Sequence, residues 1–242
     1  MNWLPPDGAL RGIALDHLLG WNLSIVFWLF VAAQVLLVVA LVRRWMSRAG
    51  AAPESARRIY FFAHVLPLLA IIGLYVWMLV TSHGLWARRE MRPPVQALQV
   101  EVTGVQFQWY FRYPGRDGVY GVTKPNLVSA PAGNPLGLDA GDPRGADDVV
   151  SSVLMLPAGQ PVEITLRTQD VIHGFFVPGM RLKQDAIPGM TGHLEFTPEK
   201  PGDYAILCSQ VCGLGHYRMQ ARMRVVSPEE FENWLAVREK AR

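Results

Sequence analysis

Two cysteines, a histidine and a methionine near the C-terminus are the residues of this chain best suited to chemistry. They are Cys208, Cys212, His216 and Met219, at the spacing C-x3-C-x3-H-x2-M. Thiolate and thioether sulfur select copper, and imidazole with thiolate and a weak methionine is the ligand set of electron-transfer copper sites. A mononuclear site of that kind uses one cysteine, whereas two cysteines four residues apart can bridge two copper ions. The spacing therefore predicts a dinuclear copper site.

A dinuclear site needs a second imidazole, and His173 in the segment Asp170-Val-Ile-His173 is the candidate. The alternative for the two cysteines is a disulfide in an exported domain. A disulfide leaves the neighbouring histidine and methionine without a role, so we favour the metal site.

Two apolar runs precede this region, at residues 22–42 and 59–80, and each is long enough to span a bilayer. The short segment between them carries five arginines, which places it in the cytoplasm by the positive-inside rule. Both ends of the chain are then outside. The arginines are Arg43, Arg44, Arg48, Arg57 and Arg58.

Charge is divided unevenly between the two parts of the chain. Residues 1–92 hold nine arginines and four acids, while residues 93–242 hold 14 bases and 16 acids, for a total of +3. The basic excess therefore belongs to the membrane part. No basic patch is interleaved with base-stacking aromatics, so we expect no nucleic-acid partner.

After residue 98 the apolar residues alternate in short runs separated by Gly and Pro, which is typical of a β-sandwich or barrel. Residues 126–148 are rich in Gly, Pro, Asn and Asp and predict an irregular excursion. Ser227-Pro-Glu-Glu230 predicts the start of a final helix. The expected strands are Gln106–Tyr113, Val162–Arg167, Gly192–Phe196, Tyr204–Leu207 and Ala221–Val226.

The expected organisation has five parts. They are an N-terminal extracytoplasmic segment (1–20), a transmembrane hairpin (21–82), a linker (83–98), the β domain (99–226) and a C-terminal helix (227–242).

Taken together, these features resemble subunit II of haem-copper cytochrome c oxidases, the subunit that holds the dinuclear CuA centre. The resemblance covers nearly the whole chain. It is carried by the hairpin, the aromatic stretch Gln106–Pro114, the segments Asp170–His173 and Leu182–Gly189, and above all the cysteine motif. It implies a two-helix transmembrane hairpin followed by an all-β cupredoxin-like Greek-key sandwich.

The resemblance also implies the copper ligands and the role of the chain. The ligands would be His173, Cys208, Gln210 through its backbone carbonyl, Cys212, His216 and Met219. The subunit would accept electrons from reduced cytochrome c at CuA and pass them to haem in subunit I, where O2 is reduced to water. It would lie in the bacterial cell (inner) membrane with subunits I and III, with the β domain on the periplasmic side.

Two alternatives to an oxidase subunit stay open: the CuA subunit of a nitric oxide reductase, and a membrane-anchored copper carrier. A quinol oxidase subunit II normally lacks the copper ligands. A departure that favours the reductase is Tyr60, where many relatives have a Glu at the mouth of a proton channel.

Gln210 is a second departure, because the family usually has Glu there and its side chain commonly reaches a Mg²⁺ or Mn²⁺ ion at the interface with subunit I. Mg²⁺ prefers a carboxylate. We therefore expect the interfacial metal to be weakened, absent, or held by other groups such as Asp185.

Phe107 stands where the family commonly has the Trp that takes the electron from cytochrome c. We expect Phe107 and Trp109 to form the electron-entry surface, with a place in the sandwich core as the alternative for both. Docking of a basic cytochrome would use exposed acids. The candidates lie in the excursion, where the alternative is a solvated acidic loop: Asp139, Asp142, Asp147 and Asp148.

Overall fold

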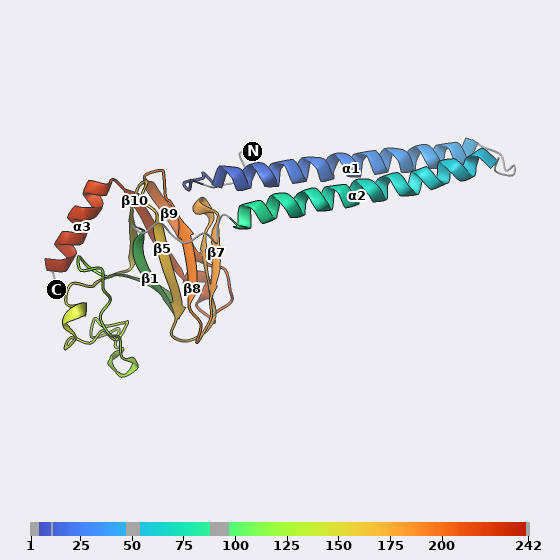
Figure 1. The fold of residues 1–242 in the computed structure, drawn as a ribbon. Helices are drawn as coiled ribbons and strands as arrows, with labels where there is room; N and C mark the ends of the chain where they lie inside the picture. Colours follow the sequence, from blue (N-terminus) through green and yellow to red (C-terminus); the bar gives the residue numbers. More distant parts are fainter. Residues whose placement is uncertain (1–4, 11, 47–53, 88–96, 241–242) are drawn as a thin grey trace. The chain divides into compact units, whose positions relative to one another are not determined.

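The computed structural model describes residues 5–10, 12–46, 54–87 and 97–240 (Figure 1). The chain divides into two compact units, one formed by residues 16–92 and the other by residues 1–15 with 93–242. The first unit contains the two long apolar helices, and the second contains the β domain.

Both predicted apolar helices are present. Helices α1 (Gly12–Met46) and α2 (Glu54–Ala87), blue and teal in Figure 1, each contain a stretch long and apolar enough to cross a membrane. Large apolar side chains such as Trp28 and Leu66 are exposed along them, as suits helices that face lipid or partner helices. Of the predicted cytoplasmic segment, which carries Arg43 to Arg58, residues 43–46 belong to α1 and residues 54–58 to α2. Residues 47–53 and the side chain of Tyr60 lie outside the described residues.

The β domain is a sandwich of two five-stranded sheets. One has the order β3-β2-β1-β5-β8 and the other β4-β10-β9-β6-β7. Most neighbouring strands are antiparallel, but β1 pairs with β5 and β4 with β10 in parallel. The strands are β1 (Leu98–Val105), β2 (Gln108–Tyr113), β3 (Val149–Ser151), β4 (Val153–Pro157), β5 (Val162–Thr168), β6 (His173–Val177), β7 (Leu182–Ala186), β8 (Gly192–Phe196), β9 (Gly202–Cys208) and β10 (Gln220–Val226).

The core lies between the two sheets and follows from the alternation seen in the sequence. In β5, Val162, Ile164 and Leu166 are buried while the residues between them are more exposed. Because successive side chains of a strand point to opposite faces, each sheet supplies one apolar face to the core. Trp109 and Phe175 are among the largest fully buried side chains.

The C-terminal helix α3 (Pro228–Lys240) covers one side of the sandwich (Figure 1). It begins as its sequence predicts, because the hydroxyl of Ser227 accepts a hydrogen bond from the Glu230 amide over 3.2 Å. Phe231 is buried, and the Trp234 ring lies 5.2 Å from the ring of Tyr113. These contacts fix α3 on the sandwich.

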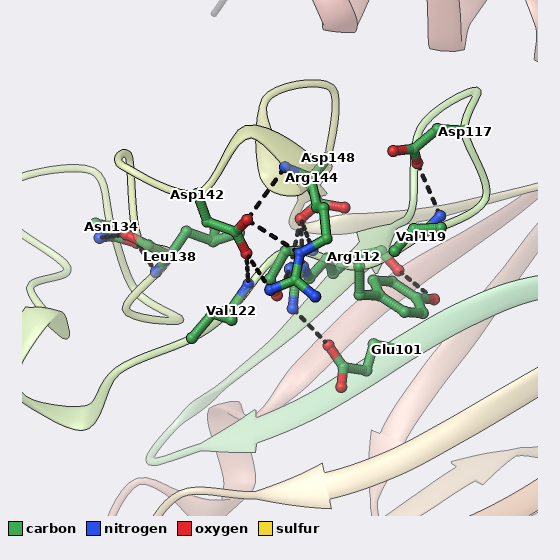
Figure 2. A network of polar contacts seen from close by, with 12 residues as sticks. Glu101, Arg112, Asp117, Val119, Val122, Asn134, Leu138, Asp142, Arg144 and Asp148 are labelled. Atoms are coloured by element: carbon green, nitrogen blue, oxygen red, sulfur yellow. Dashed lines mark hydrogen bonds and ion pairs between the residues drawn. The ribbon is translucent and has the colours of Figure 1, made fainter.

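The excursion between β2 and β3 is irregular, as predicted, and a buried arginine anchors it (Figure 2). Arg112 on β2 donates from Nε to Asp148 over 3.1 Å and from Nη1 to Glu101 over 3.1 Å. Asp148, which is fully buried, also accepts from the amide of Gly121 over 3.0 Å. The excursion is therefore held on the sheet by charged hydrogen bonds that water does not reach.

Residues 5–10 lie along the sandwich and not with the hairpin. The amide of Gly8 donates to the carbonyl of Gly179 over 2.8 Å, and that of Leu10 to the carbonyl of Thr197 over 3.1 Å. Helix α1 begins at Gly12, within the N-terminal segment expected at residues 1–20, and the boundary of that segment stays a prediction. Most of the expected linker, at residues 88–96, lies outside the described residues.

Candidate metal centre

The cysteine loop (residues 208–219) connects β9 to β10 at one end of the sandwich. Its two ends meet because the Cys208 amide donates to the Met219 carbonyl over 3.1 Å. A short 3-10 turn, His216–Arg218, precedes Met219. The antiparallel pairing of β9 with β10 thus fixes both ends of the loop.

The first group of candidate ligands gathers around Cys208. His173, the first residue of β6, places Nδ1 4.0 Å from the Cys208 sulfur. The backbone carbonyl oxygen of Gln210 lies 3.1 Å from the same sulfur. The Cys212 sulfur is 3.9 Å away, and one ligand atom from each of His173, Cys208 and Cys212 lies within 4.8 Å of the others.

The second group gathers around Cys212. Nδ1 of His216 and the thioether sulfur of Met219 each lie 3.7 Å from the Cys212 sulfur. The structure therefore brings all six predicted ligands together. One imidazole and a carbonyl oxygen lie beside one thiol, and the other imidazole and a thioether lie beside the second. The two sulfur atoms between them can bridge two metal ions.

Both cysteines are free thiols, and the 3.9 Å between their sulfur atoms is far longer than the roughly 2 Å of a disulfide bond. Burial, together with the neighbouring Cys208 thiol, raises the pKa of Cys212 to about 11. A thiol must lose its proton to become a metal ligand, so Cys212 would serve as a thiolate ligand at neutral pH only with a strongly bound cation.

A carboxylate orients the His173 ring. Nε2 of His173 lies 2.8 Å from Oδ1 of Asp170, so it donates a hydrogen bond and leaves Nδ1 facing the Cys208 sulfur. Asp170 also accepts from the backbone amides of Gln106 and Val171, each over 2.7 Å. Such a partner fixes the tautomer and the orientation of a ligating histidine. His173 itself is fully buried, which restricts the ring further.

Gln106 connects this carboxylate to the cysteine loop. Its backbone amide donates to Asp170, and its side-chain amide donates to the carbonyl of Cys212. One residue in the turn between β1 and β2 therefore holds both the partner of His173 and the backbone of the second cysteine. Neither Gln106 nor Asp170 is assigned a role from the sequence alone. The three-residue spacing of Asp170 and His173 could have predicted their contact from the sequence, whereas no sequence pattern indicates the contact of Gln106 with Cys212.

The comparisons with known proteins agree on one family. Residues 98–226, more than half of the chain, match the model "Cytochrome C oxidase subunit II, periplasmic domain". The "Alternative cytochrome c oxidase subunit 2" of Bradyrhizobium diazoefficiens is 35% identical over 228 residues, covering 88% of this chain and 78% of that protein. The chain belongs to the cytochrome c oxidase subunit II family.

Two further similarities cover less of this chain. The cytochrome c oxidase subunit 2 of Synechocystis sp. is 31% identical over 59% of this chain and 33% of that longer protein. The crystal structure of the periplasmic domain of subunit II of cytochrome oxidase (CoxB) of Bradyrhizobium japonicum covers 62% of this chain and 99% of that one. Its TM-score is 0.46 at 27% identity.

Family membership settles three of the expectations. The β domain has the cupredoxin-like fold, and the chain is one subunit of an oxidase and not a complete enzyme. With its two apolar helices it is a membrane-anchored subunit whose β domain is extracytoplasmic.

Within this subunit II sandwich, Phe107 and Trp109 lie in different places. Phe107 is 38% exposed, and its ring packs so closely on the cysteine loop that a Cβ added at Gly215 would overlap it. Trp109 is fully buried, with its ring 5.8 Å from that of His173 and 5.3 Å from that of Phe175. The expectation that Trp109 shares the surface with Phe107 is corrected: Trp109 is a core residue beneath His173.

The side chain of Gln210 turns toward Asp185 on β7. Its amide nitrogen donates to Oδ2 of Asp185 over 2.8 Å, and Nζ of Lys183 lies 3.3 Å from Oδ1 of the same carboxylate. Both oxygens of Asp185 are thus engaged by donors, one of them an ammonium group. These residues do not fit a site for Mg²⁺, which needs free oxygen ligands.

The four acids of the excursion bind neighbouring groups of the chain, as Figure 2 shows for Asp142 and Asp148. Asp139 pairs with Lys124 over 2.6 Å, and Asp142 pairs with Arg144 over 3.0 Å. Asp148 is buried and paired with Arg112, as described above. Asp147 accepts hydrogen bonds from the backbone amides of Arg116 and Asp117. The excursion is therefore a folded, internally paired element and not the expected row of acids facing solvent.

Proposed function

We propose that this chain is the electron-entry subunit of a haem-copper terminal oxidase and binds a dinuclear CuA centre. The ligands are His173, Cys208, the Gln210 carbonyl, Cys212, His216 and Met219. The observation that carries the proposal is their convergence in two groups around a pair of free, closely spaced sulfurs. Family membership supports it independently.

When bound, the dinuclear copper supplies a one-electron carrier. The residues of the chain hold its ligands still, so that little rearrangement accompanies a change of charge. Asp170 fixes His173, Gln106 fixes the Cys212 carbonyl, and the Cys208–Met219 hydrogen bond closes the loop. A preorganised set of ligands of this kind is what fast electron transfer requires.

The donor in this proposal is reduced cytochrome c or a similar soluble protein, and Phe107 is its entry point. The Phe107 ring is partly exposed and packs on the backbone of Gly213 and Gly215, between the second cysteine and His216. Trp109 lies behind it in the core, against the His173 ring. The acceptor is haem in subunit I, and O2 is reduced to water there.

The membrane in this proposal is the bacterial cell membrane, with the sandwich in the periplasm and subunits I and III as partners. Arg43 and Arg44 in the last turn of α1, and Arg57 and Arg58 near the start of α2, support a cytoplasmic segment between the helices. No step of the function passes through a divalent cation held by Gln210, because the side chain is already hydrogen-bonded to Asp185.

Electron paramagnetic resonance of the purified complex tests the copper assignment. One electron shared by two copper nuclei gives more hyperfine lines than a single nucleus does. We expect that signal in the native protein and its loss in His216→Ala. The matched control is His193→Ala, which removes an imidazole that is 58% exposed and lies in β8 outside the cysteine loop. A single-copper signal in the native protein would refute the dinuclear site and favour a copper carrier.

Turnover with reduced cytochrome c tests the reaction. We would follow O2 and NO consumption by the intact complex in separate assays, with His216→Ala as the inactive reference. Rapid, cyanide-sensitive O2 uptake with little NO turnover is the expected result. Efficient NO reduction with poor O2 uptake would overturn the oxidase assignment and place the chain with a nitric oxide reductase.

A further inference from the structure

Gln210 occupies a central position in the site, since its backbone and its side chain make contacts on different sides. The backbone carbonyl oxygen lies 3.1 Å from the Cys208 sulfur. The side-chain amide lies against Asp185 on β7. A residue whose carbonyl belongs to the ligand set is therefore fixed in place by what its side chain binds.

The charges around this side chain are already balanced. An ionised carboxylate only accepts hydrogen bonds, so the amide nitrogen of Gln210 and not its oxygen must face Asp185. The second oxygen of Asp185 is paired with Lys183, so the polar trio (Gln210, Asp185 and Lys183) carries no net charge. A divalent cation here would meet one carboxylate and an ammonium group, and would have to displace both donors.

The strand register joins the trio to the copper ligands. Asp185 lies opposite Gly174 in the β6–β7 pair, and Gly174 directly follows the proposed ligand His173 in the sequence. The carbonyl of Gly174 accepts from the amide of Ser209, which precedes Gln210 in the loop. The Gln210–Asp185 hydrogen bond therefore adds a side-chain connection beside a backbone one, and both tie the cysteine loop to the sheet that carries His173.

We propose that the cysteine loop of this subunit is tied to β7 by the Gln210–Asp185 hydrogen bond, balanced by Lys183, and that neither residue is a ligand of a divalent cation. This inference rests on the proposed function in one respect: the experiment uses the retention of bound copper to show whether the loop keeps its position. Under this proposal the neutral amide of Gln210 positions the loop. A carboxylate at position 210 could not donate to Asp185, and two negative charges would then face each other across a hydrogen-bond distance.

The experiment uses the intact complex, with Mn²⁺ as a paramagnetic probe for Mg²⁺ sites and total metal analysis. The variants are Gln210→Leu and Gln210→Glu, and the matched control is Gln184→Glu, which adds the same charge one residue from Asp185 on β7. The Gln210→Leu complex should hold as much Mn²⁺ and Mg²⁺ as the native complex does. Without added metal, Gln210→Glu should lose copper to a chelator about tenfold faster than Gln184→Glu, and Mn²⁺ should restore its retention.

The outcomes test the Gln210–Asp185 hydrogen bond and the copper assignment separately. A stoichiometric ion in the native complex that is lost in Gln210→Leu would overturn the proposal, even if both glutamate variants failed to assemble. Equal copper loss from Gln210→Glu and Gln184→Glu would also overturn it, because the hydrogen bond would then not hold the loop. Absence of the dinuclear copper signal from the native complex would instead refute the proposed function.

Discussion

Replacement of Asp170 by Asn tests most directly whether the surroundings of the copper ligands determine copper affinity. In the native chain one carboxylate oxygen accepts from His173, and the other accepts from the Gln106 amide over 2.7 Å. An asparagine side chain has one oxygen and one NH2 group. Whichever way it turns, a donor will face either the imidazole N–H or the Gln106 N–H, and one of these hydrogen bonds is lost.

The size of the effect follows from this geometry. Loss of the carboxylate partner of a ligating histidine typically lowers metal affinity 10- to 100-fold. At 1.4 kcal/mol for each factor of ten, the affinity should fall by roughly 1.4–2.8 kcal/mol. An asparagine whose oxygen stays on the fully buried His173 keeps that acceptor and loses the Gln106 hydrogen bond instead, so we expect a value in the lower half of that range.

Copper affinity is measured by competition with a chelator of known affinity on the purified, copper-loaded complex. The control is Asp203→Asn, which also removes one carboxylate charge, from an exposed pair with Arg224 on β9 and β10. Urea unfolding of the copper-free protein separates a loss of affinity from a loss of fold. If Asp170→Asn binds copper as tightly as Asp203→Asn, the orienting role of Asp170 is wrong.

Three further outcomes are expected. Phe107→Ala should slow oxidation of reduced cytochrome c while copper content stays constant, and an unchanged rate would remove Phe107 as the entry point. Asp148→Ala leaves the buried Arg112 without its main partner and should lower the free energy of unfolding in urea by about 3–5 kcal/mol; a loss below about 1 kcal/mol would contradict the buried anchor. Arg144, together with the Val122 amide, holds the pKa of Asp142 at about 2, below its unfolded value of about 3.9. The unfolded state therefore binds the proton first as pH falls, and the stabilisation, present above about pH 4, is lost as pH falls through about 2. Hydrogen exchange of the Val122 amide should report this, and loss of protection already near neutral pH would contradict it.

Sequence alone predicted those parts of the fold that depend on local pattern. Residues 162–167 alternate, and β5 covers Val162–Thr168, because a strand with one buried face imposes a period of two. The helix start at Ser227 followed from capping chemistry within four residues. Five of the six candidate copper ligands follow from one twelve-residue segment, since a loop between paired strands keeps its own residues close together.

The contacts that surround those ligands join residues far apart in the sequence, and no local pattern contains them. Gln106 reaches Cys212 across 106 positions, and Asp185 reaches Gln210 across 25. Trp109 was expected to share a face with Phe107 because the two are separated by two residues, but β2 begins only at Gln108 and Phe107 lies in the turn before it. The alternation rule does not apply across a turn, which is why this prediction was wrong.

The same long-range contacts explain why a loop containing two glycines, together with His173 on β6, can hold six candidate ligand atoms in place. Several hydrogen bonds fix the cysteine loop and its histidine partner, and four of them are the Cys208 amide to Met219, Gln106 to Cys212, Gln210 to Asp185, and His173 to Asp170. They come from four different segments of the sandwich, so no single strand movement can relax them together. Each of the two glutamines offers a neutral amide, which can tie the loop without adding a charge beside the metal. In the proposed copper centre this network would order the ligands and leave the charge of the centre to the thiolates and the copper. A change from amide to carboxylate at either glutamine should therefore alter copper retention more than an apolar replacement of the same size.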